Sequence, residues 1–429
     1  MNRIIKDIPI YLLFLSILIV AEPLSSLAHG EVTPPNQPLS GPGGKEYPHA
    51  YVIKNSYGTL GTTYWLYEPA SPTPDSAPVV VFNHGWGAMY PRTYGAWIEH
   101  IVRRGTIVIF PKYQASLLVS VARFTPNAIE AVKNALDELQ SGTHVVPDLD
   151  RFAIVGHSMG GMITANMAAL ANSEGLPQAK AVMCVQPGNS WGEYPIDLEN
   201  LSAIPAGTLL LTVVGDKEEI VGDIDAKRIF NETTQIPLLD KDFILMLSDN
   251  YGEPDLESDH FSPCAPDDGY DGLEPIYGEV DALDYYGFWK LFDGLCDAAF
   301  YGINRDFALG DTHNQRFMGN WSDGTPVIEL EVSTVNITVA SPSFGEDWAI
   351  GSIKTIEWTS LGVNGNVKIE LGQPRGCGYS WSDIASSTSN DGNHSWAVQY
   401  PPQNNCIIRI CSIEAPTVCD ESDTFDIVN

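Results

Sequence analysis

The sequence is short of positive charge. Its 429 residues include 23 Lys and Arg against 54 Asp and Glu, which gives a formal net charge of -31 at pH 7. A field this negative repels nucleic acids and anionic membrane surfaces, so neither is expected as a partner. It favours neutral or cationic substrates, although an acidic secreted or salt-adapted surface is the simpler cause.

Long apolar runs are scarce. After residue 28 no run is long enough to span a membrane, and the polar C-terminus argues against a GPI tail. Within residues 1–28, Arg3 and Lys6 precede an apolar stretch (8–21), and Ser26-Leu27-Ala28 resembles a small-residue cleavage site. This pattern predicts a secretory signal peptide cut after residue 28, with an uncleaved anchor as the alternative. The predicted location is extracellular or periplasmic.

Paired CxxC motifs with zinc-ligand spacing do not occur, so no metal site is predicted. In an exported chain, seven cysteines suggest disulfides with one thiol left over. Cys184 lies in an apolar run and is predicted to be the buried free thiol, and Cys264 is a candidate partner for Cys296. The remaining four form a C-terminal set whose pairing stays open: Cys377, Cys406, Cys411 and Cys419.

The middle of the chain alternates apolar strand patterns with amphipathic helix patterns. This alternation predicts an α/β fold, a doubly wound and mostly parallel sheet with helices on both faces. Residues 29–48 are rich in Pro and Gly and are predicted to form a linker or extended arm. Expected strands are 79–83, 106–111, 152–155, 181–185, 208–214 and 243–247, after two strand-like runs in 49–68; expected helices are 92–104, 127–140 and 281–301.

The sequence pattern changes near residue 335. Residues 336–429 show short strand-like runs separated by Gly, Asn, Ser and Pro, which is typical of a small all-β sandwich. We therefore predict a catalytic domain over 49–334 and an accessory β-sandwich domain over 335–429.

The most informative motif is Gly156-His157-Ser158-Met159-Gly160. It follows an apolar strand and precedes a small-residue helix pattern, the setting of a nucleophile elbow. The flanking glycines fit a turn too tight for side chains, and the start of the helix directs backbone N–H groups at Ser158. Ser158 is therefore the predicted nucleophile.

A serine nucleophile needs a histidine base and an orienting acid, which follow it in this fold in the order acid, then histidine. His260 lies after the last expected strand, in an acidic loop, and is the predicted base; His313 is the alternative. The acid is expected after the strand 208–214, where Glu218 is favoured and Asp216 is the rival.

The oxyanion is expected to be bound by two backbone N–H groups. One belongs to Met159, directly after the nucleophile, and the other to Trp86, in the loop His84-Gly85-Trp86-Gly87 after the strand 79–83. Of the aromatic side chains near these loops, Tyr90 and Trp191 are candidate substrate contacts, although ordinary loop packing explains them equally well.

On these residues the chain resembles the α/β-hydrolase superfamily. GHSMGG at 156–161, the HGWG loop and VVGDKEE (213–219) resemble dienelactone hydrolases, chlorophyllase-like proteins and cutinase-type polyesterases. The resemblance covers about 50–330 and implies hydrolysis of carboxylic esters through an acyl-enzyme, without a cofactor. It departs at Glu218, where Asp is commoner. Residues 336–429 resemble the Ig-like domain of Ser/Thr-rich, GPI-anchored yeast cell-wall proteins, which implies a surface or glycan contact.

The sequence thus predicts a secreted serine esterase that acts on a small-molecule or polymeric ester. Two alternatives remain. One is a peptidase or amidase on the same fold. The other is a cell-surface or glycan-binding protein with an inactive hydrolase domain.

Overall fold

The computed structural model describes residues 32–188, 195–267, 278–333, 336–363, 365–375, 378–399, 401–416 and 418–429. The predicted signal peptide, Trp191 and Cys377 lie outside these ranges. No helix in the described ranges has both the length and the apolar character needed to cross a membrane.

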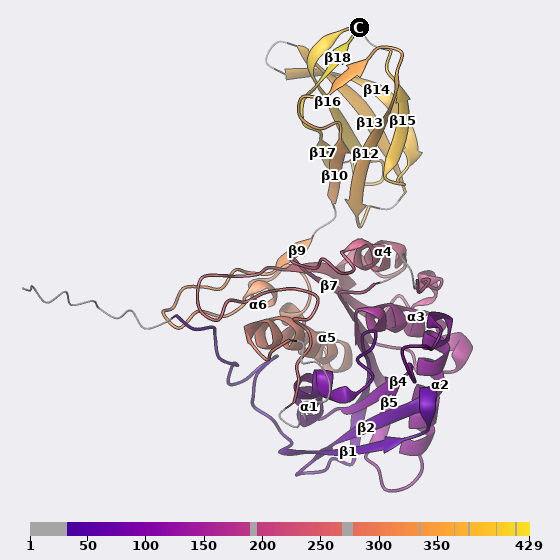
Figure 1. Ribbon diagram of the computed structural model, residues 1–429, viewed down its shortest axis with the longest axis vertical. Helices are drawn as coiled ribbons and strands as arrows, with labels where there is room; N and C mark the ends of the chain where they lie inside the picture. Colours follow the sequence, from indigo (N-terminus) through magenta and orange to yellow (C-terminus); the bar gives the residue numbers. More distant parts are fainter. Residues whose placement is uncertain are drawn as a thin grey trace, which may run out of the picture.

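A nine-stranded sheet forms the larger part of the molecule, in the order β1-β2-β4-β3-β5-β6-β7-β8-β9 (Figure 1). Strands β3 to β8 are parallel to their neighbours, while β1, β2 and β9 are antiparallel additions at the two edges. The predicted α/β-hydrolase fold is confirmed. The strands are β1 (Tyr51–Tyr57), β2 (Thr63–Ala70), β3 (Ser76–Asn83), β4 (Ile107–Lys112), β5 (Val146–His157), β6 (Ala181–Val185), β7 (Leu209–Gly215), β8 (Lys241–Met246) and β9 (Glu331–Ser333).

Helices cover both faces of this sheet. The central strands contain continuous apolar runs because alternate residues enter separate cores: Val79 and Val81 pack on one side, and Val80 and Phe82 on the other. One core lies under α2 and α3, the other under α1 and α5. The helices are α1 (Gly95–Arg103), α2 (Phe124–Leu139), α3 (Met159–Glu174), α4 (Ile224–Glu232), α5 (Trp289–Tyr301) and α6 (His313–Arg316), with a π-helical turn, η6 (Leu283–Phe288), before α5.

The Pro- and Gly-rich stretch before β1 packs against the α5 side of the sheet. The N–H of Gly43 donates to the buried carboxylate of Asp293 at 2.7 Å, and Tyr47 bonds the ring of His100. Asp293 also contacts His100 at 2.8 Å and the guanidinium of Arg104 at 3.1 Å. Residues 32–49 are therefore tied into the folded unit by a buried charge cluster.

Residues 336–429 form two mostly antiparallel sheets, a β-sandwich-like region (Figure 1). Its core contains Trp348, Trp358, Trp396 and Phe425. The alternation along β12 follows from this, because Ile356 and Trp358 face inward while Glu357 and Thr359 are exposed. The strands are β10 (Asn336–Ser341), β11 (Asp347–Ala349), β12 (Ile353–Leu361), β13 (Asn366–Arg375), β14 (Gly378–Ser389), β15 (Asn393–Ala397), β16 (Gln403–Ser412), β17 (Cys419–Glu421) and β18 (Phe425–Val428).

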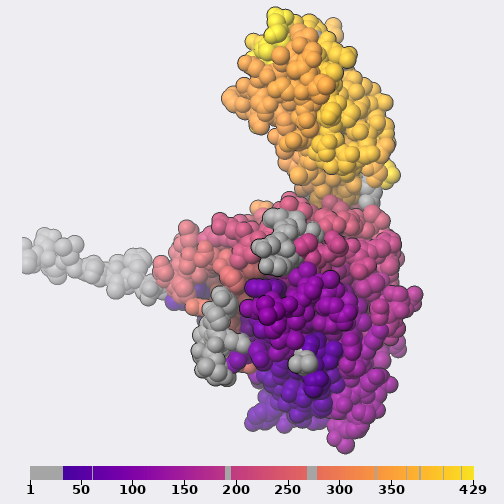
Figure 2. Space-filling model, turned by 45° about the vertical axis from the view of Figure 1, so that its right-hand side comes forward, coloured from indigo at the N-terminus to yellow at the C-terminus, as the bar shows by residue number. Residues whose placement is uncertain are grey.

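The sandwich-like region forms a separate lobe (Figure 2), and the end of β12 contacts α4. Leu361, at the end of β12, packs with Val214, Phe230 and Phe243 of the larger unit. Beside it, the Asn231 amide donates to the Ser360 carbonyl at 3.0 Å and accepts from the Gly362 N–H at 2.7 Å. The contact between the two regions thus combines apolar packing with two hydrogen bonds of one side-chain amide.

The cysteines partly overturn the prediction. Cys184 is buried and unbonded, as predicted, but Cys264 and Cys296 are unbonded too, so their predicted pairing is wrong. Cys264 contacts Tyr94, while Cys296 lies on α5 beside the charge cluster of Asp293 and Arg104. In the C-terminal set, Cys411 and Cys419 form a disulfide between directly paired positions of β16 and β17, and Cys406 is unbonded.

Candidate active site

Ser158 occupies a sharp turn between β5 and α3. Its backbone has φ 56° and ψ -126°, a conformation that costs a non-glycine residue of the order of 1–3 kcal/mol. The N–H of Ser158 donates to the Val185 carbonyl at 3.0 Å, so the neighbouring strand supports the turn. The strained backbone lifts the hydroxyl off the end of the sheet, as a nucleophile elbow requires.

The two glycines of the motif are required by close packing. A Cβ on Gly156 would lie 2.3 Å from the Gly160 carbonyl oxygen, and a Cβ on Gly160 would lie 2.2 Å from the Asn83 carbonyl oxygen. Both contacts are with backbone atoms, which cannot rotate away. Because Gly160 packs on the end of β3, the elbow and the HGWG loop are held against each other.

His260 and Glu218 form a close pair. Nδ1 of His260 lies 2.6 Å from Oε2 of Glu218, and both side chains are nearly buried, at 9% and 1% exposure. The other carboxylate oxygen of Glu218 accepts the N–H groups of Ile220 and Val221 at 2.8 and 2.9 Å. Since these bonds fix the carboxylate, Nδ1 of His260 carries the proton and Nε2 is left free to act as a base.

His260 also lies directly against the elbow. Nε2 of His157, the residue before Ser158, donates to the His260 carbonyl at 2.8 Å, and the two ring centroids are 4.9 Å apart. The base loop is further joined to the acid loop, because the Lys217 N–H donates to the Ser258 carbonyl at 3.1 Å. Three segments far apart in the sequence therefore meet at one edge of the sheet.

The rival candidates lie elsewhere. Asp216 is exposed and accepts a hydrogen bond from the Ser248 hydroxyl at 2.6 Å. His313 is 70% exposed and pairs with Glu329 at 3.2 Å. The structure brings neither into contact with His260.

The two expected oxyanion donors belong to loops that adjoin the elbow. Gly85, directly before Trp86, lies against His157 and Ser158, since a Cβ built on it would be 3.3 and 3.4 Å from their side chains. Within the described part of the chain, the N–H groups of Trp86 and Met159 donate to no other protein group. An oxyanion donor must likewise have its N–H group uncommitted to another hydrogen bond.

Two other histidines beside these loops are buried and neutral. Burial lowers the pKa of His84 to about 3, and its ring stacks on Tyr113 with a centroid separation of 4.0 Å. Burial, together with the neighbouring His260, holds the pKa of His157 well below its usual range. Because rings with such low pKa values bind a proton only weakly at pH 7, neither histidine is suited to act as a second base.

The candidate substrate contacts are less informative. Tyr90 is 37% exposed and its ring lies under the ammonium of Lys112, which is 4.4 Å from the ring centroid. Trp86 is 48% exposed. Trp191 lies outside the described residues, so the structure does not bear on it.

Sequence reasoning missed three residues that support the site. The Tyr94 hydroxyl bonds both the Gly85 N–H and Nδ1 of His157, each at 2.9 Å. Gln186, in the left-handed region at φ 43°, donates to the Asp259 carbonyl at 2.7 Å. The carboxylate of Asp259 caps the base turn by accepting the Phe261 N–H at 2.8 Å. Only the Asp259-His260-Phe261-Ser262 turn has a local signal, an Asx turn; the other contacts are long-range.

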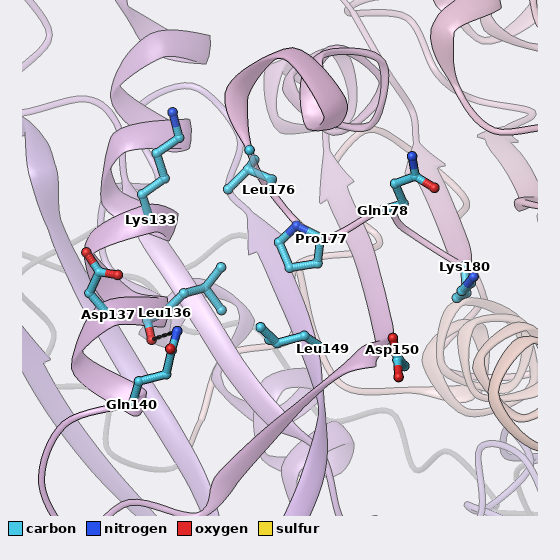
Figure 3. Close-up of a pocket in the computed structure, with 11 residues that line it drawn as sticks. Lys133, Leu136, Asp137, Gln140, Leu149, Asp150, Leu176, Pro177, Gln178 and Lys180 are labelled. Carbon is cyan, nitrogen blue, oxygen red and sulfur yellow. Dashed lines mark hydrogen bonds between the residues drawn. The ribbon is translucent and has the colours of Figure 1, made fainter.

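One cavity of about 540 Å³ lies away from the elbow. It opens between the C-terminal half of α2 and the segment that joins α3 to β6 (Figure 3). Leu149 and Asp150 in its lining belong to the N-terminal half of β5, whose other end leads to Ser158. Its charged lining residues include Lys133, Asp137 and Lys180. Because no residue of the elbow, the acid loop or the base loop lines it, this cavity is not part of the candidate site. No group of three or more metal-binding side chains occurs among the described residues.

The arrangement supplies the parts of a nucleophilic acyl transfer. A strained serine, a histidine oriented by a carboxylate, and open backbone donors converge at the carboxyl ends of the parallel strands. The parts come from four loops that follow β3, β5, β7 and β8, which is how this fold builds its sites.

Comparison with known proteins agrees with this geometry. The family model described as Chlorophyllase matches residues 68–194, a range that contains the HGWG loop and the elbow but not Glu218 or His260. Esterase LipI of Mycobacterium tuberculosis (strain ATCC 25618 / H37Rv) is 31% identical over 158 residues, which are 35% of this chain and 48% of that protein. The chain thus spans about half the length of this curated relative. Both similarities support an α/β-hydrolase-type superfamily.

Proposed function

We propose that the protein is a serine hydrolase that cleaves carboxylic esters through an acyl-enzyme. The Ser158 oxygen attacks the ester carbonyl carbon while Nε2 of His260 takes the hydroxyl proton. The N–H groups of Trp86 and Met159 bind the oxyanion. The tetrahedral intermediate collapses, the bond to the alcohol oxygen breaks, and His260 returns the proton to the leaving alcohol.

Deacylation repeats these steps with water. His260 removes a proton from the water, whose oxygen attacks the acyl carbon, and the bond to the Ser158 oxygen then breaks. The carboxylic acid leaves and Ser158 regains its proton. Glu218 keeps its negative charge throughout and stabilises the imidazolium that forms in each half-reaction.

The observation that carries the proposal is the His260–Glu218 pair seated on the elbow. The carboxylate lies 2.6 Å from Nδ1 of His260, while the His260 carbonyl is bonded to the residue before Ser158. A ring oriented through Nδ1, with Nε2 directed away from the carboxylate, is what a general base requires.

The similarity to Esterase LipI favours ester hydrolysis over peptide hydrolysis. The two are separated by comparing p-nitrophenyl esters with p-nitroanilides of the same acyl group. We expect turnover of the esters, and Ser158→Ala should abolish it while leaving the melting temperature close to that of the wild type. Near wild-type activity in this variant, or preference for the anilides, contradicts the proposal.

We further propose that the chain is secreted and consists of a catalytic domain over 49–334 and an accessory domain over 335–429. The charged and apolar pattern of residues 1–28 supports export. The accessory domain would contact a cell wall or glycan. Sequencing the N-terminus of the secreted protein tests the first point, with cleavage after Ala28 expected. Retention of the full-length Ser158→Ala variant on insoluble cell-wall polysaccharide tests the second, and recovery entirely in the unbound fraction contradicts it.

A further inference from the structure

We infer that Tyr94 and His157 are positioning residues, which lock the oxyanion loop, the nucleophile elbow and the base loop together through one directional chain of hydrogen bonds. The inference rests on the proposed function, since it assigns roles around the same site. Both residues are buried, at 0% and 2% exposure.

This hydrogen-bond chain has a consistent set of donors and acceptors, with Cys264 as a further contact of the Tyr94 hydroxyl. The N–H of Gly85 can only donate, so it donates to the Tyr94 oxygen at 2.9 Å. At the other end the His260 carbonyl can only accept, so Nε2 of His157 carries a proton and donates across 2.8 Å. Between them, Tyr94 donates its hydroxyl proton to Nδ1 of His157 across 2.9 Å.

This assignment requires a neutral His157 ring. A protonated ring would carry hydrogens on both nitrogens, and Tyr94 would then lose its acceptor. Burial and the adjacent His260 depress the pKa of His157 far below neutrality, so the neutral form is the one present. Burial also raises the pKa of Tyr94 well above its usual value, so its hydroxyl keeps the proton it donates.

This chain of hydrogen bonds joins the three segments on which acyl transfer depends. Gly85 directly precedes the proposed oxyanion donor Trp86, and His157 directly precedes the nucleophile. The far end holds the backbone of the base itself. A second bond, from Gln186 to the Asp259 carbonyl at 2.7 Å, holds the preceding peptide of the same turn. Two consecutive carbonyls of the base loop are therefore fixed from the sheet, and the side chain of His260 is aimed by its backbone as well as by Glu218.

Tyr94→Phe tests the chain with a minimal change. The variant removes one hydroxyl and leaves Gly85 and His157 without their shared partner. Because displacement of a catalytic group by about 1 Å can cost ~100-fold in rate, we expect kcat per titrated active site to fall between tenfold and ~100-fold, with KM nearly unchanged. The matched control is Tyr64→Phe, which removes a partly buried hydroxyl that donates to the Asn134 carbonyl on α2 at 3.2 Å. It should keep the wild-type kcat.

A second pair of variants decides the matter if Tyr94→Phe unfolds. In His157→Gln the amide can donate to the His260 carbonyl and accept from Tyr94, whereas His157→Leu can do neither. We expect the glutamine variant to recover most of the kcat that the leucine variant loses. Equal kcat in both variants, or a Tyr94→Phe enzyme as fast as Tyr64→Phe, overturns the inference.

Titration with a fluorophosphonate separates this result from failure of the proposed function. If Ser158 is not the nucleophile, the probe leaves Ser158 unlabelled in every variant, and Ser158→Ala turns over ester as fast as the wild type. If Ser158 is the nucleophile but the chain has no positioning role, every folded variant is labelled and turns over ester at the wild-type rate.

Discussion

Replacing Glu218 by glutamine changes the charge of this side chain and the position of the proton on His260 while keeping the shape of the site. In the native protein one carboxylate oxygen accepts the N–H groups of Ile220 and Val221, and the other accepts from Nδ1 of His260. In Glu218→Gln the amide oxygen must face the two N–H groups, so the NH₂ group faces His260. Nδ1 then has to accept, its proton moves to Nε2, and the ring can no longer take a proton from Ser158.

The expected loss follows from that wrong tautomer and from the missing negative charge beside the imidazolium. An equivalent acid-to-amide change in a serine triad costs ~10⁴-fold in kcat, which corresponds to about 5.4 kcal/mol of transition-state stabilisation. The melting temperature should change little, because the amide keeps the bonds to Ile220 and Val221. KM should also change little, since Glu218 makes no contact with substrate in the proposed mechanism.

The assay is the steady-state hydrolysis of a short p-nitrophenyl ester, with Asp216→Asn as the matched control. Asp216 lies two positions before Glu218 in the same loop, but its carboxylate accepts a hydrogen bond from the Ser248 hydroxyl instead of one from His260. Its amide variant should retain nearly all activity. A Glu218→Gln enzyme within tenfold of wild type, or a large loss in Asp216→Asn, would refute the assignment of the acid.

Three further predictions concern residues that support the site and the fold around it. Gly160→Ala places a Cβ 2.2 Å from a backbone carbonyl oxygen, so we expect a ~1–3 kcal/mol loss of stability and a ~100-fold lower kcat. Gly207→Ala adds a Cβ to open space and should change neither quantity; equal results for the two variants in urea unfolding and ester assays would contradict the close packing of Gly160. Lys290 is buried, and burial lowers its pKa to about 7, so the folded state releases this proton at a lower pH than the unfolded state. The resulting stabilisation is fully present above pH 10.5 and is lost as the pH falls to about 7. Between these values the free energy of unfolding of the wild type should rise relative to that of Lys290→Met by about 1.4 kcal/mol per pH unit, whereas a pH-independent difference contradicts the lowered pKa. Asp293→Asn removes the buried carboxylate that binds the Gly43 N–H, His100 and Arg104, while Arg104 keeps Asp297 at 3.3 Å. We expect a loss of ~1–3 kcal/mol in urea unfolding, with kcat per titrated site unchanged; no measurable loss would mean that the cluster does not hold the N-terminal arm.

The parts of the fold that the sequence predicts are those with a local periodic signal. The strand expected at 181–185 is β6 to the residue, and the strands expected at 208–214 and 243–247 differ from β7 and β8 by one or two positions. Continuous apolar runs identify these strands because both faces of the sheet are covered. The helix expected at 127–140 begins three residues earlier, at Phe124, with Pro126 in its first turn.

The sequence is less informative where contacts join distant segments. Gly43 and Asp293 are 250 positions apart, and no spacing rule links them. The proposed Cys264–Cys296 pair was wrong for the same reason, because two thiols in one domain say nothing about which face of the sheet each occupies. The Tyr94–His157 chain is also invisible in the sequence, since a tyrosine in a loop and a histidine beside a nucleophile each have ordinary packing explanations.

The candidate site lies between these extremes. The motif and the strand order point to Ser158 and His260, but the choice between Glu218 and Asp216 depends on loop geometry that two adjacent carboxylates cannot reveal. In the structure the longer side chain of Glu218 turns back to its own loop N–H groups and reaches His260, while Asp216 leaves the strand toward Ser248. Which of two carboxylates two positions apart points toward the histidine depends on the conformation of the loop, and the sequence does not give that conformation.

Covalent labelling of the nucleophile tests the central claim most directly. The full-length protein is treated with a fluorophosphonate, digested, and analysed by mass spectrometry. We predict one stoichiometric adduct on Ser158, formed more slowly when an excess of ester substrate is present during labelling, and slowed strongly in the Glu218→Gln variant. An unlabelled Ser158 in folded protein, or an adduct on a different serine, would contradict it.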